Sequence, residues 1–555
     1  MSIGSTRKLT RLQVGALPLI RAIMARMHLR DILLQYSPSS SRQSFPRTDL
    51  LILLTVNLSL AKDPLYELGE WVNGLDLRSL GYEQRPNPSL SDDRFARALD
   101  QLYWLDRTSL LTRLVVSAIQ AFEIRSERIH NDSTSVKACG RIPGSTRTGL
   151  ELRRGHSKDH RPDLKQLVYS LSVSDDGAVP IHHHVYPGNR NDETTHIETW
   201  NALCQIHASP QFLYVADCKL CTQSQLSHIV EHGGKAITIL PHNLIEVRRF
   251  YDQLRADPPA KKLLWRRPKP NYPATNESYY LFEGTYFTEQ GHYPLYWFYS
   301  SEKSQRDRQS RQERLEVAEQ ELAQLAPRLN AYHLKSQAQI LGSAQAILKH
   351  YRVECFIDLR LEWHTQVIRH RPRGRPGQKV SYRYEHRVSY SLHWTRNTAA
   401  LIAQARIDGV FPLLCTDPQI LPKAVLQAYK FQARLEKRFC QFKSVHRAAP
   451  LLFKKIERVE ANMFIFFVAL LIQALLEREL RKKLHARGAP PLKLYPEDRD
   501  APHPTTSQLF KTFDRLSTYT ITEEGRLCEE YHDELNETHR AVLSLLDITE
   551  AEFWN

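Results

Sequence analysis

The chain has 555 residues, several times the usual length of one domain, so two to four domains are expected. Hydrophobic residues make up 42% of it and charged residues 25%, which is ample for buried cores and ordinary for a soluble protein. The net charge of +15 indicates a polyanionic partner and favours nucleic acid over a membrane surface.

The cysteines and the apolar segments bear on the compartment. The eight cysteines are dispersed without a regular framework, which fits a reduced cytoplasm. Met1 to Thr10 is polar and basic, unlike a signal peptide. The longest apolar run, Met463 to Leu476, is shorter than a bilayer span and contains Gln473, so it predicts a buried core helix. We expect a cytoplasmic protein with no membrane partner.

Residues 1–120 consist of Leu-rich segments separated by polar breaks, which predicts an all-helical N-terminal domain. Its opening segment carries more basic than acidic residues. A small basic helical domain is a common DNA-binding format. An oligomerisation or packing module is the other interpretation, and no recognition helix stands out.

Residues 125–240 change to strands and then to alternating helix and strand. This order predicts an α/β fold with a mixed sheet, whose functional groups gather at strand ends. Asp132 lies in the middle of the first strand, and Asp217 ends the fourth. The expected strands are Arg128–Val136, Leu164–Val173, Ala178–Val185, Gln211–Ala216 and Ala236–Leu240, with a hairpin turn at Asp175–Gly177 and helices from Asp192 to Cys204 and up to about His232.

Residues 241–405 read as an insertion in which this alternation lapses after Pro241. Ser301–Leu329 has the 3-4 apolar spacing of a coiled-coil seam, kinked at Pro327, and Ala338–Tyr351 is its expected partner helix. Two long alternating runs follow and predict a β-hairpin. Its tip is strongly basic and predicts nucleic-acid contact through Arg371, Arg373 and Arg375.

Residues 406–485 contain a strand, Val410–Cys415, and two helices, Tyr429–Lys443 and Glu457–Arg481. At about 100° per residue, one face of the first helix carries a phenol, an amide, a carboxylate and an ammonium. These groups are Tyr429, Gln432, Glu436 and Lys443. Residues 486–555 carry an acidic excess; they are expected to form helices, to shield the basic surface or to take part in dimerisation.

Three carboxylates could converge in this fold. A mid-strand aspartate such as Asp132 is costly to bury unless it is bound to something. If the first and fourth strands are neighbours, Asp132 and Asp217 lie side by side, and the helix lays Glu436 across them. Hard oxygen ligands of this kind suit Mg²⁺ or Mn²⁺. Two such ions would support in-line attack on phosphorus.

Several motifs together resemble one family. Tyr429, Glu436 and Lys443 match the signature Y-x2-R-x3-E-x6-K, which is typical of a large group of DDE transposases of bacterial insertion sequences. Further similar segments are PLYELGEWV (Pro64–Val72), GHSKDHRPDLKQ (Gly155–Gln166), YPGNRND (Tyr186–Asp192) and VADCKL (Val215–Leu220). The similarity covers most of the chain.

The resemblance implies an RNase H-like core in two parts, 125–240 and 406–485, interrupted by the insertion. It also implies cut-and-paste DNA transposition, in which an endonuclease nicks double-stranded DNA at the element ends and transfers strands into a target. Asp132, Asp217 and Glu436 would be the catalytic, metal-binding triad for two ions. Tyr429 and Lys443 would hold terminal phosphates, and a homodimer would pair the two ends in the bacterial, nucleoid-associated cytoplasm.

One position departs from the signature, because Gln432 replaces its arginine. Glutamine can donate a hydrogen bond to phosphate but carries no charge, so we expect a weaker grip on the terminal phosphate and a gain in end binding from Gln432→Arg. Related enzymes place an aromatic residue of the insertion against a flipped-out base, so the resemblance makes Trp297, Trp363 and Trp394 candidates, although such residues are more often core or hairpin packing residues. His156, Lys158 and Arg161 form a basic loop with expected DNA contact, or serve solubility only.

Other functions fit parts of the same evidence. A metal-dependent DNA nuclease on the same core would cut but not join. A non-catalytic, transposase-derived DNA-binding protein would not need three acids. A nucleotide-driven motor is excluded, since no G-x4-G-K-[ST] loop occurs.

Overall fold

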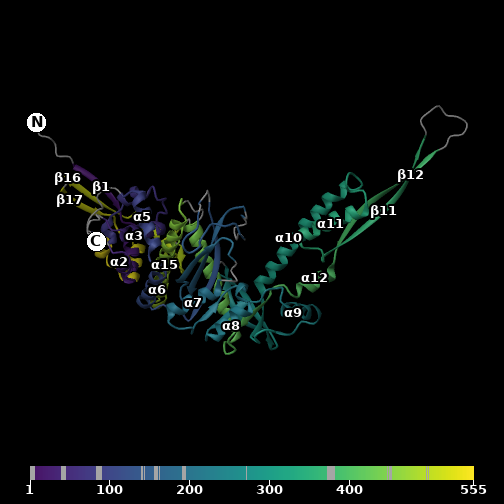
Figure 1. The fold of residues 1–555 in the computed structure, drawn as a ribbon, viewed down its shortest axis with the longest axis horizontal. Coiled ribbons are helices and arrows are strands. Elements are labelled where there is room, and N and C mark those ends of the chain that lie inside the picture. Colours follow the sequence, from purple (N-terminus) through teal and green to yellow (C-terminus); the bar gives the residue numbers. More distant parts are fainter. Residues whose placement is uncertain are drawn as a thin grey trace. The chain divides into compact units, whose positions relative to one another are not determined.

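The computed structural model describes residues 7–38, 45–82, 90–138, 142, 144–155, 161, 163–190, 195–269, 272–371, 382–446, 448, 453–495, 497, 499–524 and 526–555. The chain forms two compact units (Figure 1). Unit 1 comprises Met1–Thr238, Cys415–Asp417 and Ala424–Asn555, and unit 2 comprises Ile239–Leu414 and Pro418–Lys423. The five-part division drawn from the sequence stays a prediction.

The N-terminal part of unit 1 is mainly helical, as the Leu-rich segments indicated. The helices are α1 (Leu17–Arg26), α2 (Leu29–Tyr36), α3 (Arg47–Ser59), α4 (Leu68–Asn73), α5 (Asp92–Trp104) and α6 (Arg107–Phe122), with a 3-10 turn at Leu77–Leu80. The expectation of helix alone is wrong, because Arg7–Gln13 forms strand β1. Its partner lies about 500 residues away, so no local pattern marks it.

The C-terminal part of unit 1 completes this region. Strand β1 pairs antiparallel with β16 (Ser517–Glu523), which pairs with β17 (Arg526–His532). Two of the tail's acids meet N-terminal arginines: Glu523 lies 3.7 Å from Arg7, and Glu530 lies 3.0 Å from Arg78. Shielding of the basic surface by this tail stays a prediction, since these two pairs leave both arginine side chains largely exposed. The other elements are β14 (Leu492–Lys493), β15 (Asp500–Ala501), α16 (Thr506–Phe513), α17 (Glu537–Leu546) and α18 (Glu550–Trp554).

Helix α15 (Ile456–Ala486) is the core of unit 1. It packs against α1, α3, α5, α17 and strand β4, and Ala461 to Leu480 are buried throughout. Among the described residues it is the one helix long and apolar enough to cross a membrane, and 94% of its apolar window is buried inside the protein. The prediction of a buried core helix around Met463–Leu476 is confirmed.

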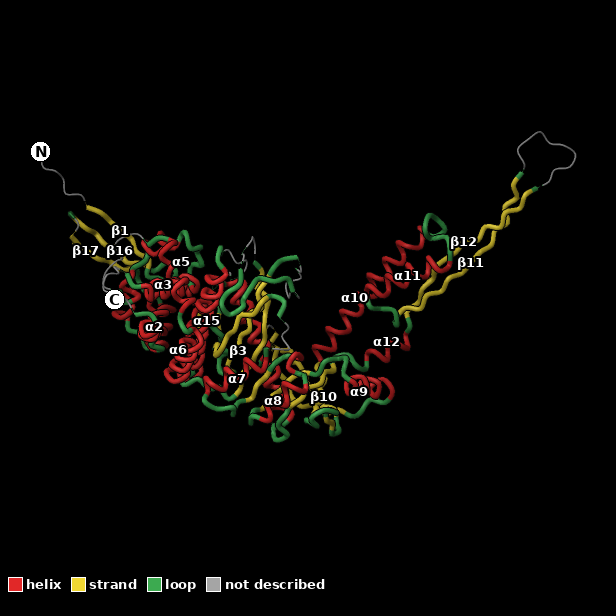
Figure 2. Tube along the Cα trace, viewed as in Figure 1, coloured by secondary structure: helices red, strands yellow, loops and turns green. Residues whose placement is uncertain are grey.

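A mixed sheet lies beside this helix in unit 1 (Figure 2). Its strand order is β4-β3-β2-β5-β6; the first two pairings are antiparallel and the last two parallel. The predicted α/β class and the adjacency of the first and fourth strands are confirmed. The strands are β2 (Arg128–Lys137), β3 (Gln166–Ser174), β4 (Pro180–Pro187), β5 (Leu213–Val215) and β6 (Lys235–Ile239), and the intervening helices are α7 (His196–His207) and α8 (Gln223–Glu231).

The turn between β3 and β4 lies at the predicted place. Gly177 has φ +87°, a conformation that L side chains rarely adopt. A Cβ added there would approach Arg478 to 3.0 Å. Glycine is thus required both by the backbone and by the neighbouring helix α15.

Unit 2 contains more regular structure than its sequence indicated. Strands β13 (Val410–Cys415), β10 (Pro294–Ser300), β8 (Tyr272–Phe282) and β7 (Lys261–Lys269) pair in that order, and β9 (Tyr286–Phe287) also pairs with β10. Helices α9 (Ile245–Ala256) and α12 (Thr398–Ala405) flank them in the sequence. The expected lapse of order after Pro241 is wrong, because residues such as Lys261, Arg266 and Arg267 mask a strand that also contains Leu263 and Trp265.

The remainder of unit 2 was predicted correctly. Helices α10 (Ser301–Leu325) and α11 (Gln337–Tyr351) pack together, and a 3-10 turn at Ala326–Arg328 follows α10 at Pro327. Strands β11 (Ile357–His370) and β12 (Arg383–Arg396) form the hairpin. One buried cluster joins helices to strands; it contains Leu315, Ala318, Leu322, Leu325, Ile340, Ala344, Leu348, Ile357 and Leu392.

Candidate active site

Asp132 lies on β2, and Asp217 lies two residues beyond the end of the neighbouring parallel strand β5. His130 of β2 pairs in register with Val215 of β5, and each aspartate lies two residues further along its chain. Since side chains alternate between faces, Asp132 shares the face of His130. Backbone bonds orient both carboxylates: Asp132 Oδ1 accepts from Ser133 N at 2.7 Å, and Asp217 Oδ1 from Lys219 N at 3.0 Å.

The predicted helix Tyr429–Lys443 is present but not uniform. Helix α13 (Pro422–Lys430) ends at Phe431, α14 runs from Gln432 to Cys440, and Gln441–Val445 is a π-helical turn. The interruption has a tertiary cause: the Phe431 ring packs 4.8 Å from the His130 ring. Phe442 in the π turn stacks 4.5 Å from Tyr169 of β3. Both ends of α14 are thereby fixed to the sheet.

Gln432 docks α14 directly on β2. Its Nε2 donates to the Asn131 carbonyl at 2.9 Å, and its Oε1 accepts from His130 Nδ1 at 3.2 Å. Burial lowers the pKa of His130 to about 4, although the bond to Gln432 opposes that shift. The amide is thus engaged with the protein, which differs from the predicted phosphate contact.

This docking places Glu436 over the same part of the sheet. Residues four apart lie on one helix face, so Glu436 follows Gln432 by one turn. Glu436 is exposed, while Lys443 is half-buried in the π turn. Arg434 points elsewhere: its guanidinium lies 5.6 Å over the Phe431 ring, and its charge helps to lower the pKa of His503.

All three acids influence the pKa of the Tyr429 phenol. Burial raises its pKa strongly, and the negative charges of Asp217, Glu436 and Asp132 raise it further. Burial also raises the pKa of Tyr214 on β5, and the charges of Asp217 and Asp132 raise that pKa further. The fold therefore brings the three predicted carboxylates into electrostatic range of one hydroxyl, and that hydroxyl stays protonated at neutral pH.

Asp132, Asp217 and Glu436 are the residues that could hold a divalent cation. Three carboxylates provide the oxygen donors that Mg²⁺ and Mn²⁺ prefer. Within the described part of the chain, no three His, Cys, Asp or Glu side chains are close enough together to enclose a metal ion. The donor chemistry fits, and closure around an ion would require the carboxylates to approach one another.

Arg438 anchors the far end of α14 and was not anticipated from the sequence. Its guanidinium is buried and donates to the carbonyls of Gly177 at 3.1 Å and Ala178 at 3.0 Å. It also donates to Glu477 Oε2 of α15 at 2.9 Å. Burial alone would raise the pKa of Glu477, but the charges of Arg438 and Arg481 hold it below its usual value. The signal available in the sequence was an arginine among the apolar positions of an amphipathic helix.

The other predicted DNA-binding residues have different fates. Arg161 is described, and its guanidinium pairs with Asp163 at 2.8 and 2.7 Å. Arg371 is exposed just beyond β11. His156, Lys158, Arg373 and Arg375 lie outside the described residues.

The prediction that Trp297 contacts a DNA base is wrong. It is 1% exposed and stacks 3.9 Å from Phe250, so it is a packing residue of unit 2 and cannot meet a base in this conformation. The alternation of β10 buries it against α9, a helix that the sequence analysis did not anticipate. Trp363, the second candidate, is 66% exposed.

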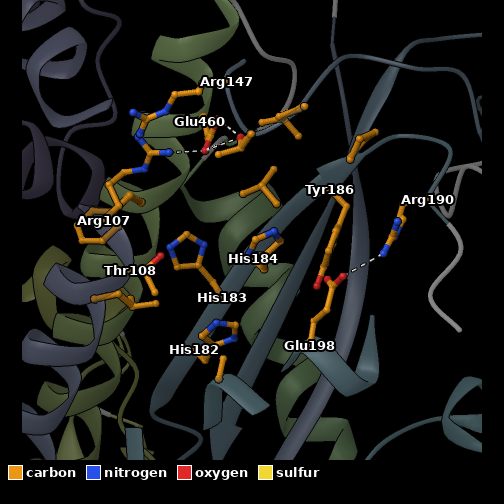
Figure 3. A pocket seen from close by; sticks show the side chains of 18 of the residues that line it. Arg107, Thr108, Arg147, His182, His183, His184, Tyr186, Arg190, Glu198 and Glu460 are labelled. Atoms are coloured by element: carbon orange, nitrogen blue, oxygen red, sulfur yellow. Dashed lines mark hydrogen bonds and ion pairs between the residues drawn. The ribbon is translucent and has the colours of Figure 1, made fainter. Parts of the chain in front are cut away.

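A cavity of about 1230 Å³ is lined by residues of β4, the edge strand of the sheet (Figure 3). His182, His183 and His184 line it, and burial lowers the pKa of His182 to about 3. Arg190 pairs with Glu198 at 3.2 Å, and Arg107 pairs with Glu460. His183 also stacks on Phe467 at 4.8 Å. Neutral imidazoles and paired ions give this cavity little net charge.

Comparisons with known proteins give limited likenesses. A family model described as a domain of unknown function, DUF4277, matches residues 9–116, less than half of the chain. No curated protein matches. The chain is similar at 10% identity to a piggyBac transposase synaptic complex with hairpin DNA, with a TM-score of 0.27 and coverage of 52% of this chain and 66% of that one. It is similar, also at 10% identity, to a Mos1 transposase paired-end complex with the left transposon end, with a TM-score of 0.14 and coverage of 36% and 60%. The chain thus spans less than two thirds of either structure.

Proposed function

We propose that the protein is a DNA transposase of an insertion sequence, with an RNase H-like core that cuts element ends and transfers strands into target DNA. One observation carries the proposal: the Tyr429 phenol lies within electrostatic range of Asp132 on β2, of Asp217 just beyond the neighbouring strand β5, and of Glu436 on α14. The Y-x2-R-x3-E-x6-K resemblance supports it, since two residues of the signature, Tyr429 and Glu436, lie within electrostatic range of each other. The net charge of +15 supports DNA as the partner.

Asp132, Asp217 and Glu436 would hold two Mg²⁺ or Mn²⁺ ions. Such ions supply activation of a water or 3′-hydroxyl and stabilisation of the leaving oxygen. Tyr429 is protonated at neutral pH and can donate a hydrogen bond to a phosphate oxygen. Lys443 contributes a positive charge beside the same phosphate. Gln432 acts as a positioning residue that fixes α14, and through it Glu436, on β2.

Two further parts of the proposal follow from pairing two DNA ends. A homodimer would handle both ends together. It would act in the bacterial cytoplasm near the nucleoid, a reducing compartment that suits dispersed cysteines. The cutting and joining experiment described next also distinguishes a transposase from a nuclease that cuts DNA without joining it.

The test uses DNA from both flanks of the coding sequence, incubated with full-length protein and Mg²⁺ or Mn²⁺. We expect cutting at the element ends and joining of a 3′-hydroxyl end to a target plasmid. Glu436→Gln should reduce both by about a thousandfold or more, as expected when one member of a catalytic unit is removed. Glu537→Gln, an exposed glutamate of α17, is the matched control and should leave both unchanged.

Two results would contradict the proposal: no cutting by the folded wild type, or cutting by Glu436→Gln at the wild-type rate. Cutting without joining would support the nuclease instead. DNA binding with no cutting by either protein would support the non-catalytic alternative.

A further inference from the structure

The hairpin of β11 and β12 has a face that is only half covered. Pairing puts Leu359 opposite Trp394 and Leu361 opposite Leu392, and these residues pack against the α10–α11 cluster. The same face continues through Trp363, Thr365, Val367 and Arg369 on β11, and through Val388, His386 and Tyr384 on β12. The strands run on past the helical pair (Figure 1, Figure 2).

The continuing part is exposed although it is apolar. We call residues 363–371 and 382–388 the distal ribbon, and its Trp363 side the distal face. On the distal face Trp363 is 66% exposed, Tyr384 57% and Val367 53%. A two-stranded hairpin is marginally stable in water by itself. An apolar face on such a ribbon therefore indicates an occupant.

The charge of the distal ribbon identifies the occupant. It carries four arginines (Arg369, Arg371, Arg383 and Arg387) against one glutamate, Glu385. Glu385 is itself paired with His370 at 2.8 Å. A second copy of the same ribbon would meet like charge and be repelled. A polyanion is attracted, and aromatic side chains among arginines suit a nucleic acid.

The dimensions of the distal ribbon favour double-stranded DNA over single-stranded DNA. The DNA major groove is about 12 Å wide and admits a two-stranded β-ribbon. Eight strand residues extend roughly 27 Å, a length that lies within one turn of the duplex. Arg369 is held 3.8 Å over the Tyr382 ring, which keeps its guanidinium on the ribbon's surface.

We propose that the distal ribbon lies in the major groove of double-stranded DNA, with the distal face toward the bases and its two arginines, Arg369 and Arg371, contacting base edges and phosphates. Trp363, Val367 and Val388 would make apolar contacts such as those with thymine methyl groups. The inference rests on the proposed function for the source of the DNA, namely the element end or the target. It assigns contact to the described strands themselves, beyond the basic tip predicted from the sequence.

The experiment measures binding of full-length protein to a labelled duplex of about two helical turns by fluorescence anisotropy, with EDTA present so that cutting plays no part. Trp363→Ala/Tyr384→Ala should weaken binding by about tenfold, the effect of losing one good groove contact. Arg369→Gln/Arg371→Gln, on the distal face, should lower the slope of log K against log salt by about two, since each neutralised phosphate contributes about 0.9. Gln366→Ala/Ile368→Ala, on the opposite face of the same strand, is the matched control and should bind like the wild type.

Loss of binding in both ribbon variants with an unchanged control supports the inference, and a failure of cutting in the earlier experiment would not alter that result. Wild-type binding by both ribbon variants overturns it. It is also overturned if single-stranded DNA binds more tightly than the duplex, or if the Trp363→Ala/Tyr384→Ala variant loses a dimer, detected by light scattering, while its DNA affinity is unchanged.

Discussion

The candidate active site and the distal ribbon differ in how their side chains are held. At the site, Gln432, Phe431 and Arg438 fix α14 to β2, to the β3–β4 turn and to α15 through several buried contacts. In the distal ribbon, one ladder of backbone bonds sets the positions of side chains that remain exposed. Chemistry on phosphorus requires fixed groups, whereas a surface that follows a long polymer can be completed by that polymer.

The largest expected effect is a loss of stability when a buried contact of the candidate active site is removed. Arg438→Met removes one partner of a buried ion pair and leaves Glu477 and two carbonyls without it. Loss of one member of such a pair costs about 3–5 kcal/mol of unfolding free energy, measured by chemical denaturation. Arg434→Met, an exposed arginine of the same helix, is the control. Equal stability of the two variants would contradict the role assigned to Arg438.

Acid should weaken the same region. The folded-state pKa of His130 is about 4, below its ordinary 6.5, so the unfolded chain binds more protons between these values. Stability is therefore fully present above about pH 6.5 and falls as the pH drops toward 4, by roughly 3 kcal/mol for this one group. In His130→Gln the dependence of unfolding free energy on pH should be shallower. His182 and His446, whose pKa values are also lowered by burial, would retain the remainder of the slope.

Removing the docking amide should have a smaller effect. Gln432→Leu keeps the volume but leaves His130 Nδ1 and the Asn131 carbonyl without their partner, at a cost of about 2 kcal/mol in stability. Cutting should fall more than DNA binding does, because Glu436 is displaced from the aspartates. Gln427→Leu, at an exposed glutamine of α13, is the control. A Gln432→Leu variant with wild-type stability and cutting would show that the docking is dispensable.

The smallest expected effect on stability comes from the exposed distal face, which can be compared with the buried cluster of unit 2. Val367→Ser/Val388→Ser on the distal face should change unfolding free energy by no more than about 0.5 kcal/mol, since both side chains are exposed. Leu322→Ala in the buried cluster should cost about 2–5 kcal/mol. Thermal unfolding measures both. A large loss for the valine pair would mean that the distal face is already packed within the free protein.

The sequence was sufficient where periodicity reflected local burial. Alternation along β11 and β12, the 3-4 spacing of Leu315 to Leu329 and the apolar run in α15 each predicted an element that the structure contains. The order of the strands also predicted correctly that the strand carrying Asp132 and the strand preceding Asp217 are neighbours. Such patterns arise because one face of each element is buried.

The sequence was insufficient where distant contacts decide. Strand β7 is rich in lysine and arginine, and its pairing with β8 overrides that composition. At the interruption, the Phe431 ring packs at a tilt against the His130 ring of β2, and the Gln432 amide bonds to two groups of the same strand. Trp297 is covered by Phe250 of a helix that no periodicity revealed. Each of these outcomes depends on a neighbour remote in the chain.

The pairing of β1 with β16 has a consequence for biosynthesis. Arg11 near the start of the chain donates to Ser517 at 3.0 Å, across a separation of 506 residues. A nascent polypeptide can complete the contiguous α10–α11 and β11–β12 region while translation continues, but β1 must wait until β16 has been synthesised about 500 residues later. We therefore expect chains that stop before β16 to carry β1 without its partner strand.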